Sequence, residues 1–483
     1  MRKHKASHTK SIARRRAAKH QRRARRHQTS FRGPLPRPAV RADDPTLTSH
    51  AGLLPVISFM SQQLDLVTRL REIVGWVGRE RTHPIHLVLL AFVVGALAGV
   101  ERMAHLDEAL RGDPVLVKFL RLAYWPVRKV FAVALASLND RARDALVDLV
   151  SELGLGTLPK TTTSVVVDID STALVDNGDA EGSMFGYCGK GRRRRRHFPL
   201  VASVGEGRAI VLAKYRDGSN IKTEEMIEFL GDVIRRLRAH FGPGCKITIR
   251  GDAGVWCPAV GNWLVQQGVP LVMAQPLTAG VKLLLHTLAF EPLDEDGDIE
   301  FAHLPGARVG IGAAFRIAVV RRQVHDQGAP PQGKVVEGHP HWRYQAVVSD
   351  QDWEPPDLWR FYNGRADCER VFRIGKQALA LGHLVSRRFR ANEIAFLLRT
   401  LAFNADIEFQ AHCERRAREA NRSVRRVGLE WRQPRFYQTA GRLLREAGRW
   451  VLRVPANHLL ADLWSFYAPD LVVGAAANEV IAA

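Results

Sequence analysis

Two aspartates stand at the ends of predicted β-strands, where their carboxylates could take part in chemistry. Asp170 ends a β-branched run that begins at Ser164, and Asp252 directly follows a second run, residues 246–249. In this chain order the two strands are neighbours in a sheet, so the two carboxylates can meet in one cleft. Glycines on both sides of Asp252 leave its backbone free to direct the acid. A lone aspartate at a strand end is more often a turn former, so chemistry requires a third partner.

The third partner is predicted on a helix. In the helical stretch after Asp357, four residues with polar groups stand at offsets of 0, 3, 7 and 14: Tyr362, Arg365, Glu369 and Lys376. At about 100° per residue they share one helix face about 60° wide. An exposed stripe of salt bridges is the alternative interpretation, because Arg365 and Glu369 are four residues apart and would pair on any solvated helix.

Together these residue types are suited to cutting a phosphodiester bond. The reaction needs an activated water or sugar hydroxyl, and positive charge beside the attacking and leaving oxygens; two Mg²⁺ ions about 4 Å apart supply both. Because Mg²⁺ prefers oxygen ligands and keeps some of its waters, three acids suffice: Asp170, Asp252 and Glu369. Mn²⁺ is the expected substitute. Arg365 and Lys376 would hold phosphate oxygens, and Tyr362 can donate a hydrogen bond.

Residues 362–369, which read YNGRADCE, resemble the Tyr-Arg-Glu-Lys signature of bacterial insertion-sequence transposases with a DDE active site; Lys376 follows seven residues later. The resemblance spans roughly residues 58–410. Its other motifs are Leu97-Ala98-Gly99-Val100-Glu101, expected in a helix; Ile169-Asp170-Ser171-Thr172 around the first acid; Glu181-Gly182-Ser183 with Gly186-Tyr187; and Arg250-Gly251-Asp252-Ala253-Gly254 around the second acid. The order and spacing of these motifs are more specific than any one of them.

The resemblance implies an α/β fold, in which an RNase H-like catalytic core is interrupted by a β-rich insertion. Glu369 follows Asp252 by 117 positions, which leaves room for that insertion. It also implies cut-and-paste transposition: a homodimer binds the terminal inverted repeats of its element and joins them to target DNA by metal-dependent cleavage and strand transfer. The catalytic and metal-binding acids are then Asp170, Asp252 and Glu369, and Tyr362, Arg365 and Lys376 contact the DNA.

Two features depart from this pattern or leave it open. Asp168 and Asp170 face the same way on one strand, so either could be the first metal ligand; Asp170 is favoured because Thr172 follows it, as in the family motif. Five arginines fall in a predicted turn between the first and second strands, where we expect DNA contact: Arg192, Arg193, Arg194, Arg195 and Arg196. A solvated run of charge is the alternative.

Trp342 is a further candidate for contact with DNA. In related transposases an aromatic residue of the insertion stacks against a flipped base, and Trp342 lies in the corresponding region. Burial in the core of the insertion is the alternative.

Apolar periodicity divides the chain into segments. Residues 50–160 predict a separate helical domain, to which we assign binding of DNA ends, and residues 163–276 the first part of the core. In that part three strands, a helix, a strand, a helix and a strand follow one another, with Thr223 as the predicted N-cap of the first helix. A β-rich insertion is predicted for residues 277–350, the second part of the core for 351–410, and a C-terminal helical region for 411–483.

The formal charge of +22 and the pI near 10.4 indicate a polyanionic partner. Fifteen of the 71 Lys and Arg residues lie within residues 1–41, which contain no acid, so residues 1–45 predict a disordered basic arm with a proline-rich linker. The most apolar run, Leu87 to Val100, is too short to span a bilayer and predicts a buried helix. With neither membrane segment nor signal peptide, we expect a cytoplasmic protein associated with the nucleoid.

Two other functions fit the same residues. A DNA-binding protein without catalysis, either a degenerate transposase or a repressor, would rely on the basic arm and not on the acids. An RNase H-like nuclease would share the metal chemistry but would not transfer strands.

Overall fold

The computed structural model describes residues 41, 43–75, 83–189, 192–204, 209–293, 297–324, 341–422 and 427–455, without the side chains of residues 366–369. The chain divides into two units, Met1–Pro45 and Thr46–Ala483. Of the predicted basic arm, residues 1–45, only residues 41 and 43–45 are described. The helices and strands among the described residues all belong to the second unit.

Seven helices follow the short strand β1 (Leu47–Thr48) in the part described before the main sheet. They are α2 (Leu53–Gln62), α3 (Leu66–Val74), α4 (Ile85–Leu97), α5 (Met103–Leu110), α6 (Pro114–Phe119), α7 (Arg128–Ser137) and α8 (Asp140–Gly156). Ten consecutive residues of α4, from Val88 to Leu97, are buried, which confirms the predicted core helix. No helix among the described residues is long and apolar enough to cross a membrane.

The motif of residues 97–101 was expected to be helical, but it lies at the end of α4. Helix α4 ends at Leu97, and Gly99 adopts a φ of +83°, a conformation in which glycine avoids the strain of a side chain. The amide of Val100 bonds back to the carbonyl of Gly95, which completes the helix end. The motif is therefore the stop signal of α4.

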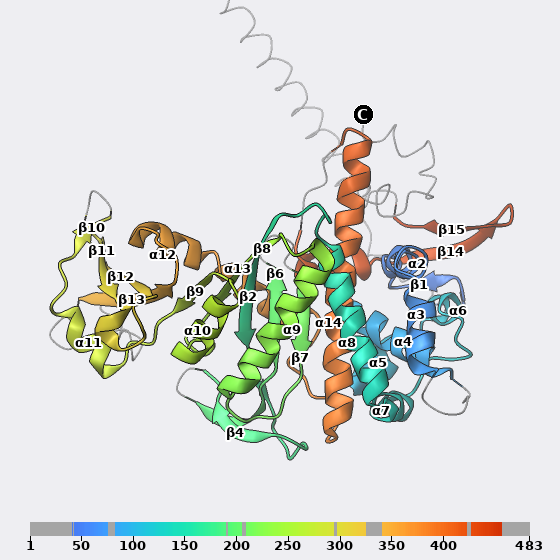
Figure 1. Cartoon of the computed structure of the whole chain (residues 1–483). Helices are drawn as coiled ribbons and strands as arrows, with labels where there is room; N and C mark the ends of the chain where they lie inside the picture. The colour runs from blue at the N-terminus through green and yellow to red at the C-terminus, as the bar shows by residue number, and fades with distance from the viewer. Residues whose placement is uncertain are drawn as a thin grey trace, which may run out of the picture. The chain divides into compact units, whose positions relative to one another are not determined.

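The N-terminal helices do not form a separate core. One apolar cluster contains side chains of α2 to α8 together with those of α14 (Phe389–Glu419), and α14 packs along α4, α7 and α8. Figure 1 shows α14 beside α8. Periodicity within residues 50–160 could not show this, because it identifies a buried helix face but not the element that covers it.

The main sheet contains the five strands predicted for the first part of the core: β2 (Ser164–Ser171), β6 (Leu200–Val204), β7 (Ile210–Lys214), β8 (Lys246–Gly251) and β9 (Leu271–Ala274). Their spatial order is β9-β8-β2-β6-β7; β2 is parallel to β8 and antiparallel to β6. Helices α9 (Thr223–Phe241) and α10 (Pro258–Gln266) share the apolar core of these strands. The N-cap of α9 is Lys222, so the expectation for Thr223 is off by one residue.

The predicted insertion extends this sheet and is not a detached subdomain. It comprises α11 (Ala279–Leu285), β10 (Glu291–Pro292), β11 (Ile299–Pro305), a 3₁₀ turn (Gly306–Val309), β12 (Arg316–Gln323) and β13 (Trp342–Ser349). Strand β13 pairs antiparallel with β9, which gives a nine-stranded sheet ordered β10-β11-β12-β13-β9-β8-β2-β6-β7. Trp342 is half-buried, and the Arg321 guanidinium lies over its ring, 4.4 Å from the centre. The ring therefore already packs against a side chain of the protein.

Four of the five arginines, Arg193 to Arg196, lie in a strand, and Arg192 lies in the turn before it. Strand β5 (Arg193–His197) lies between β3 (Leu174–Val175) and β4 (Met184–Tyr187) in a small three-stranded sheet. Arginine has no strong preference for strands, so composition alone predicted a loop; the pairing with β4 makes this segment extended.

The expected continuous helix after Asp357 is two helices. Helix α12 (Pro355–Asn363) ends at Gly364, and α13 (Ala366–Ala378) starts after Arg365. The amide of Arg365 bonds to the carbonyl of Tyr362, three residues back, instead of continuing the four-residue pattern. The single 60° face predicted for residues 362–376 is therefore wrong.

The C-terminal region is only partly helical. After α14 come α15 (Leu429–Arg432), a π-helical turn (Gln433–Tyr437), β14 (Gly441–Glu446) and β15 (Arg449–Arg453). The turn residues Ala447 and Gly448 both have positive φ, at 47° and 80°, as in hairpins with two-residue turns. The prediction of helix for residues 411–483 is therefore wrong for 441–453.

Candidate active site

Strands β2 and β8 bring the two predicted aspartates together. Their parallel register pairs Asp168 with Arg250 and Ile169 with Gly251. The next residue is Asp170 on β2 and Asp252 directly after β8. Asp170 is 9% exposed, and its Oδ1 accepts the backbone amide of Ser171 at 2.8 Å. Both acids therefore lie at the carboxyl ends of adjacent central strands, as the sequence predicted.

Arg365 contacts both carboxylates. Its Nη2 lies 3.1 Å from Oδ2 of Asp170 and 3.9 Å from Oδ2 of Asp252. The side chains of Arg365 and Asp170 are 9% and 13% exposed, so their contact is shielded from water, whereas the Asp252 side chain is 37% exposed. The start of α13 is thereby held against the ends of β2 and β8.

Asp168 has a different environment from Asp170, although both belong to β2. Asp168 is fully buried, and Arg250 holds it with a two-pronged contact: Nε to Oδ1 at 2.6 Å and Nη2 to Oδ2 at 2.9 Å. A buried carboxylate in a bidentate contact with arginine is a strong structural pair. This geometry favours Asp170 over Asp168 as the acid that faces substrate.

Arg250 also explains why α12 and α13 are separate helices. Its Nη1 donates to the carbonyl of Phe361 at 2.6 Å. In an unbroken helix this carbonyl would accept the amide of Arg365 instead. A Cβ on Gly364 would lie 2.5 Å from the same Nη1, so only glycine leaves room for the contact. Arg250 was not singled out in the sequence, although its register opposite Asp168 could have revealed it.

Lys376, in the last turn of α13, reaches the same strand end. Its Nζ lies 3.5 Å from the carbonyl oxygen of Ala173, three residues beyond Asp170. Burial lowers the pKa of Lys376, while the charges of Asp170 and Cys188 oppose that shift. The lysine is therefore electrostatically coupled to the first acid.

Tyr362 is also buried, at 8% exposed. It packs with Leu358 of α12 against Val272, Ala318 and Val347 on strands β9, β12 and β13. This packing anchors α12 on the sheet. Contact of Tyr362 with DNA stays a prediction.

Glu369 belongs to α13, between Arg365 and Lys376, but its side chain lies outside the described residues. Among the side chains that are described, no group of three His, Cys, Asp or Glu is gathered to hold a metal ion. Asp170 and Asp252 nevertheless face one shared cation, the Arg365 guanidinium, and carboxylate oxygens are the donors that Mg²⁺ prefers. The residues that are described therefore fit a divalent metal.

The five arginines differ in exposure. Arg192, Arg193 and Arg194 are exposed, Arg195 is half-buried, and Arg196 is 2% exposed. The Arg196 guanidinium bonds to the carbonyl of Tyr187 and to Asn220, and it stacks 3.7 Å above the Phe198 ring. Arg196 therefore holds the small sheet on the protein, and its neighbours are the ones accessible to DNA.

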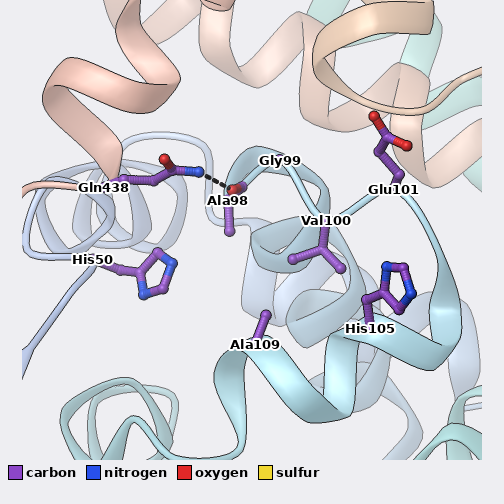
Figure 2. Close-up of a pocket in the computed structure, with 8 residues that line it drawn as sticks. All are labelled: His50, Ala98, Gly99, Val100, Glu101, His105, Ala109 and Gln438. Carbon is purple, nitrogen blue, oxygen red and sulfur yellow. Dashed lines mark hydrogen bonds between the residues drawn. The ribbon is translucent and has the colours of Figure 1, made fainter.

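A cavity of about 360 Å³ lies elsewhere, at the end of α4 (Figure 2). It is lined by His50, Ala98, Gly99, Val100, Glu101, His105, Ala109 and Gln438, and the side-chain amide of Gln438 donates to the carbonyl of Ala98 at 2.9 Å. Neither Asp170 nor Asp252 lines it. We therefore place the candidate active site at the strand ends and not in this cavity.

Comparison with known families decides the broad class. A family profile described as transposase DDE domain, group 1, matches residues 37–299, more than half of the chain. The chain belongs to the DDE transposase family. The matched span contains Asp170 and Asp252 and ends before Glu369. Members of this family generally use divalent metal ions.

Other comparisons with this DDE transposase are more distant. No curated protein matches the chain. A solved structure similar to it is that of the piggyBac transposase synaptic complex with hairpin DNA, at 11% identity and a TM-score of 0.43, covering 89% of this chain and 84% of the other.

Proposed function

We propose that this DDE transposase binds the terminal inverted repeats of its element and moves it by metal-dependent strand cleavage and strand transfer. One observation carries the proposal: Arg365 at the start of α13 lies within 4 Å of both Asp170 and Asp252. Three segments far apart in the sequence thereby converge on one point. Such convergence of acids with a cation is what a phosphodiester substrate requires.

The proposed metal ligands are Asp170, Asp252 and Glu369. Bound Mg²⁺, or Mn²⁺ in its place, would supply an activated nucleophile and neutralise charge on the leaving oxygen, with two ions as the usual number. Glu369 is assigned because it lies four residues after Arg365 and seven before Lys376 on the helix that meets both strand ends.

The cations of α13 are assigned to substrate phosphate. In this proposal Arg365 exchanges its carboxylate partners for phosphate oxygens when metal and DNA bind, and its planar fork suits two oxygens at once. Lys376 provides a point charge near the end of β2. Arg192, Arg193 and Arg194, which are exposed, extend the positive surface for DNA.

The order of the central strands supports an RNase H-like core. Strands β2, β6 and β7 form an antiparallel run, and β8 and β9 add parallel to β2 on its other side. In this arrangement the first and fourth core strands are central neighbours. Both carry a proposed metal ligand at the carboxyl end.

Transposition brings together two DNA ends, so we propose a homodimer in the complex with element ends and target DNA, acting on the bacterial nucleoid in the cytoplasm. A twofold arrangement would present one set of acids to each end.

The test uses DNA that flanks the protein's own gene, incubated with the full chain and Mg²⁺, beside Asp252→Ala and Glu369→Ala. The proposal expects metal-dependent cleavage at the element ends and joining to target DNA, and neither reaction with either variant. Cleavage without joining would indicate that the protein is a nuclease and not a transposase. Binding without cleavage would leave a DNA-binding protein only.

A further inference from the structure

Strand β4 exposes three large apolar side chains within four residues. Met184 is 48% exposed, Phe185 67% and Tyr187 59%. Exposed aromatic groups gathered in this way mark a surface that meets a partner. None of the three lines the cavity at the end of α4 or belongs to the proposed metal ligands.

The hairpin of β4 and β5 carries its two aromatic side chains on one face, and the buried Arg196 lies on the opposite face. In the antiparallel register Phe185 lies opposite Arg195 and Tyr187 opposite Arg193, so rings and guanidinium groups alternate on one face. Consistent with this, the Arg195 guanidinium lies 6.0 Å from the centre of the Phe185 ring. We call the four side chains of Phe185, Tyr187, Arg193 and Arg195 the hairpin face.

The opposite side of the hairpin is fixed to the protein. A Cβ on Gly186 would lie 2.3 Å from Nε of the buried Arg196, so the arginine lies across the glycine. On the hairpin face itself, Nε of Arg195 donates to Oγ of Ser183 at 3.1 Å. At the base of the hairpin, a Cβ on Gly182 would lie 2.8 Å from the Phe389 ring. The hairpin face is therefore presented by a rigid support.

The hairpin starts beside the proposed active site. Only Thr172 and Ala173 separate β2 from β3, and the carbonyl of Ala173 contacts Lys376. In Figure 1, β4 lies beyond the carboxyl end of the β2 arrow. Strand β3 pairs with β5, so the small sheet that contains the hairpin follows directly after the end of β2.

The chemistry of the hairpin face selects nucleic acid with unpaired bases. Residues 184–197 contain no Asp or Glu, so the surface is purely cationic and aromatic. Proteins bind single strands by this combination, with guanidinium groups on phosphates and rings stacked on bases. Along a strand, residues two apart are separated by about 6.8 Å, twice the roughly 3.4 Å between stacked bases, so one base fits between two rings. Paired bases in duplex DNA do not offer these faces.

We propose that the hairpin face binds unpaired bases of the element DNA next to the cleaved phosphate. Phe185 and Tyr187 stack on the bases, while Arg193 and Arg195 hold the adjoining backbone. The proposal rests on the proposed transposase function, and it adds that the DNA is locally opened at the site of cleavage.

The test compares two labelled duplexes of equal length, one fully paired and one with a four-nucleotide unpaired segment, bound to the full chain at increasing salt. Wild type is expected to bind the unpaired duplex more tightly. Because stacking contributes to affinity and depends less on salt than phosphate contacts, this preference should persist at high salt. Phe185→Ala or Tyr187→Ala should weaken binding of the unpaired duplex by roughly 5- to 150-fold, with little change for the paired one.

Matched variants separate stacking from folding. Phe185→Leu and Tyr187→Leu keep apolar volume but remove the ring, so they should lose the preference as well. Met184→Ala changes a residue that is 48% exposed on the other side of the same strand, and this variant should keep the preference.

The outcomes distinguish the two proposals. If wild type cleaves its element ends but Phe185→Ala and Tyr187→Ala retain the full preference for unpaired DNA, the hairpin proposal is overturned and the transposase proposal stands. If wild type cleaves neither duplex nor its element ends under Mg²⁺, the transposase proposal itself fails.

Discussion

Arg250 joins three parts of the site that the sequence separates. Its guanidinium holds the buried Asp168, takes the carbonyl of Phe361 and excludes any side chain at residue 364. A charge buried in this way stabilises only while all its partners are present. We therefore regard Arg250 as a positioning residue that sets where α13 begins and so where Arg365 points.

Gly364→Ala tests this role, because the added methyl group would lie 2.5 Å from Nη1 of Arg250. We expect the free energy of unfolding to fall by about 1–3 kcal/mol, as for other overpacked sites, and DNA cleavage to fall with it. Urea unfolding and a cleavage assay measure the two effects.

Gly280→Ala is the control, since nothing lies within 4 Å of a Cβ at that position of α11. Equal stability and activity of Gly364→Ala and Gly280→Ala would show that Arg250 does not control the helix break.

At the scale of elements, β1 and α6 are joined through one carboxylate. Asp113 caps α6 by accepting the amide of Leu116 at 3.0 Å, and its other oxygen accepts the Thr48 hydroxyl at 2.6 Å. Burial would raise the pKa of Asp113, but hydrogen bonds from His50, Thr48 and Leu116 hold it below its ordinary value of 3.8. The folded state therefore favours the ionised acid.

The sign of this shift predicts a pH dependence. Stability from an acid with a depressed pKa is fully present above the unfolded value and is lost as the pH falls through the folded value. Wild type should therefore exceed Asp113→Asn in free energy of unfolding at pH 7, and the difference should shrink below about pH 4. A difference that stays constant from pH 7 to pH 3 would contradict the assignment.

How far the elements follow from the sequence depends on where their contacts come from. The five core strands were predicted within a few residues because alternating or continuous apolar runs reflect burial directly. The break at Gly364 was not predicted, because its cause is a hydrogen bond from Arg250 to the carbonyl of Phe361. These two residues are 111 positions apart in the sequence. Likewise β5 is a strand only because β4 pairs with it, and five arginines carry no local sign of that pairing.

The site divides in the same way. Asp170, Asp252 and Arg365 were predicted from spacing, and the structure brings them together. Tyr362 packs with an apolar cluster on the sheet, and its predicted contact with DNA stays a prediction. Glu369 stays a prediction, since it rests on its position in α13.

At the scale of the whole molecule, charge is distributed unevenly. Fifteen Lys and Arg residues precede residue 42, and these residues lie almost wholly outside those the structure describes. An arm without acids should bind phosphates without regard to sequence, so it should raise affinity and its dependence on salt.

Deletion of residues 1–41 should reduce the slope of log binding constant against log salt concentration by about 0.9 for each phosphate the arm neutralises. Cleavage by DNA-bound protein should persist, because the proposed acids are unchanged. Fluorescence anisotropy from 50 to 300 mM salt measures the slope, with full-length Asp252→Ala as the control. An unchanged slope after deletion would show that the arm does not contact DNA.

The central claim is that Asp170, Asp252 and Glu369 hold the metal ions. The most direct test uses electron paramagnetic resonance to measure Mn²⁺ binding. The proteins compared are wild type, Asp170→Asn, Asp252→Asn and Glu369→Gln. Asp357→Asn, at an exposed position, is the control. We expect each of the three substitutions to weaken Mn²⁺ binding by about 10- to 100-fold or more, while Asp357→Asn binds as wild type does. Undiminished binding in all three variants would contradict the claim.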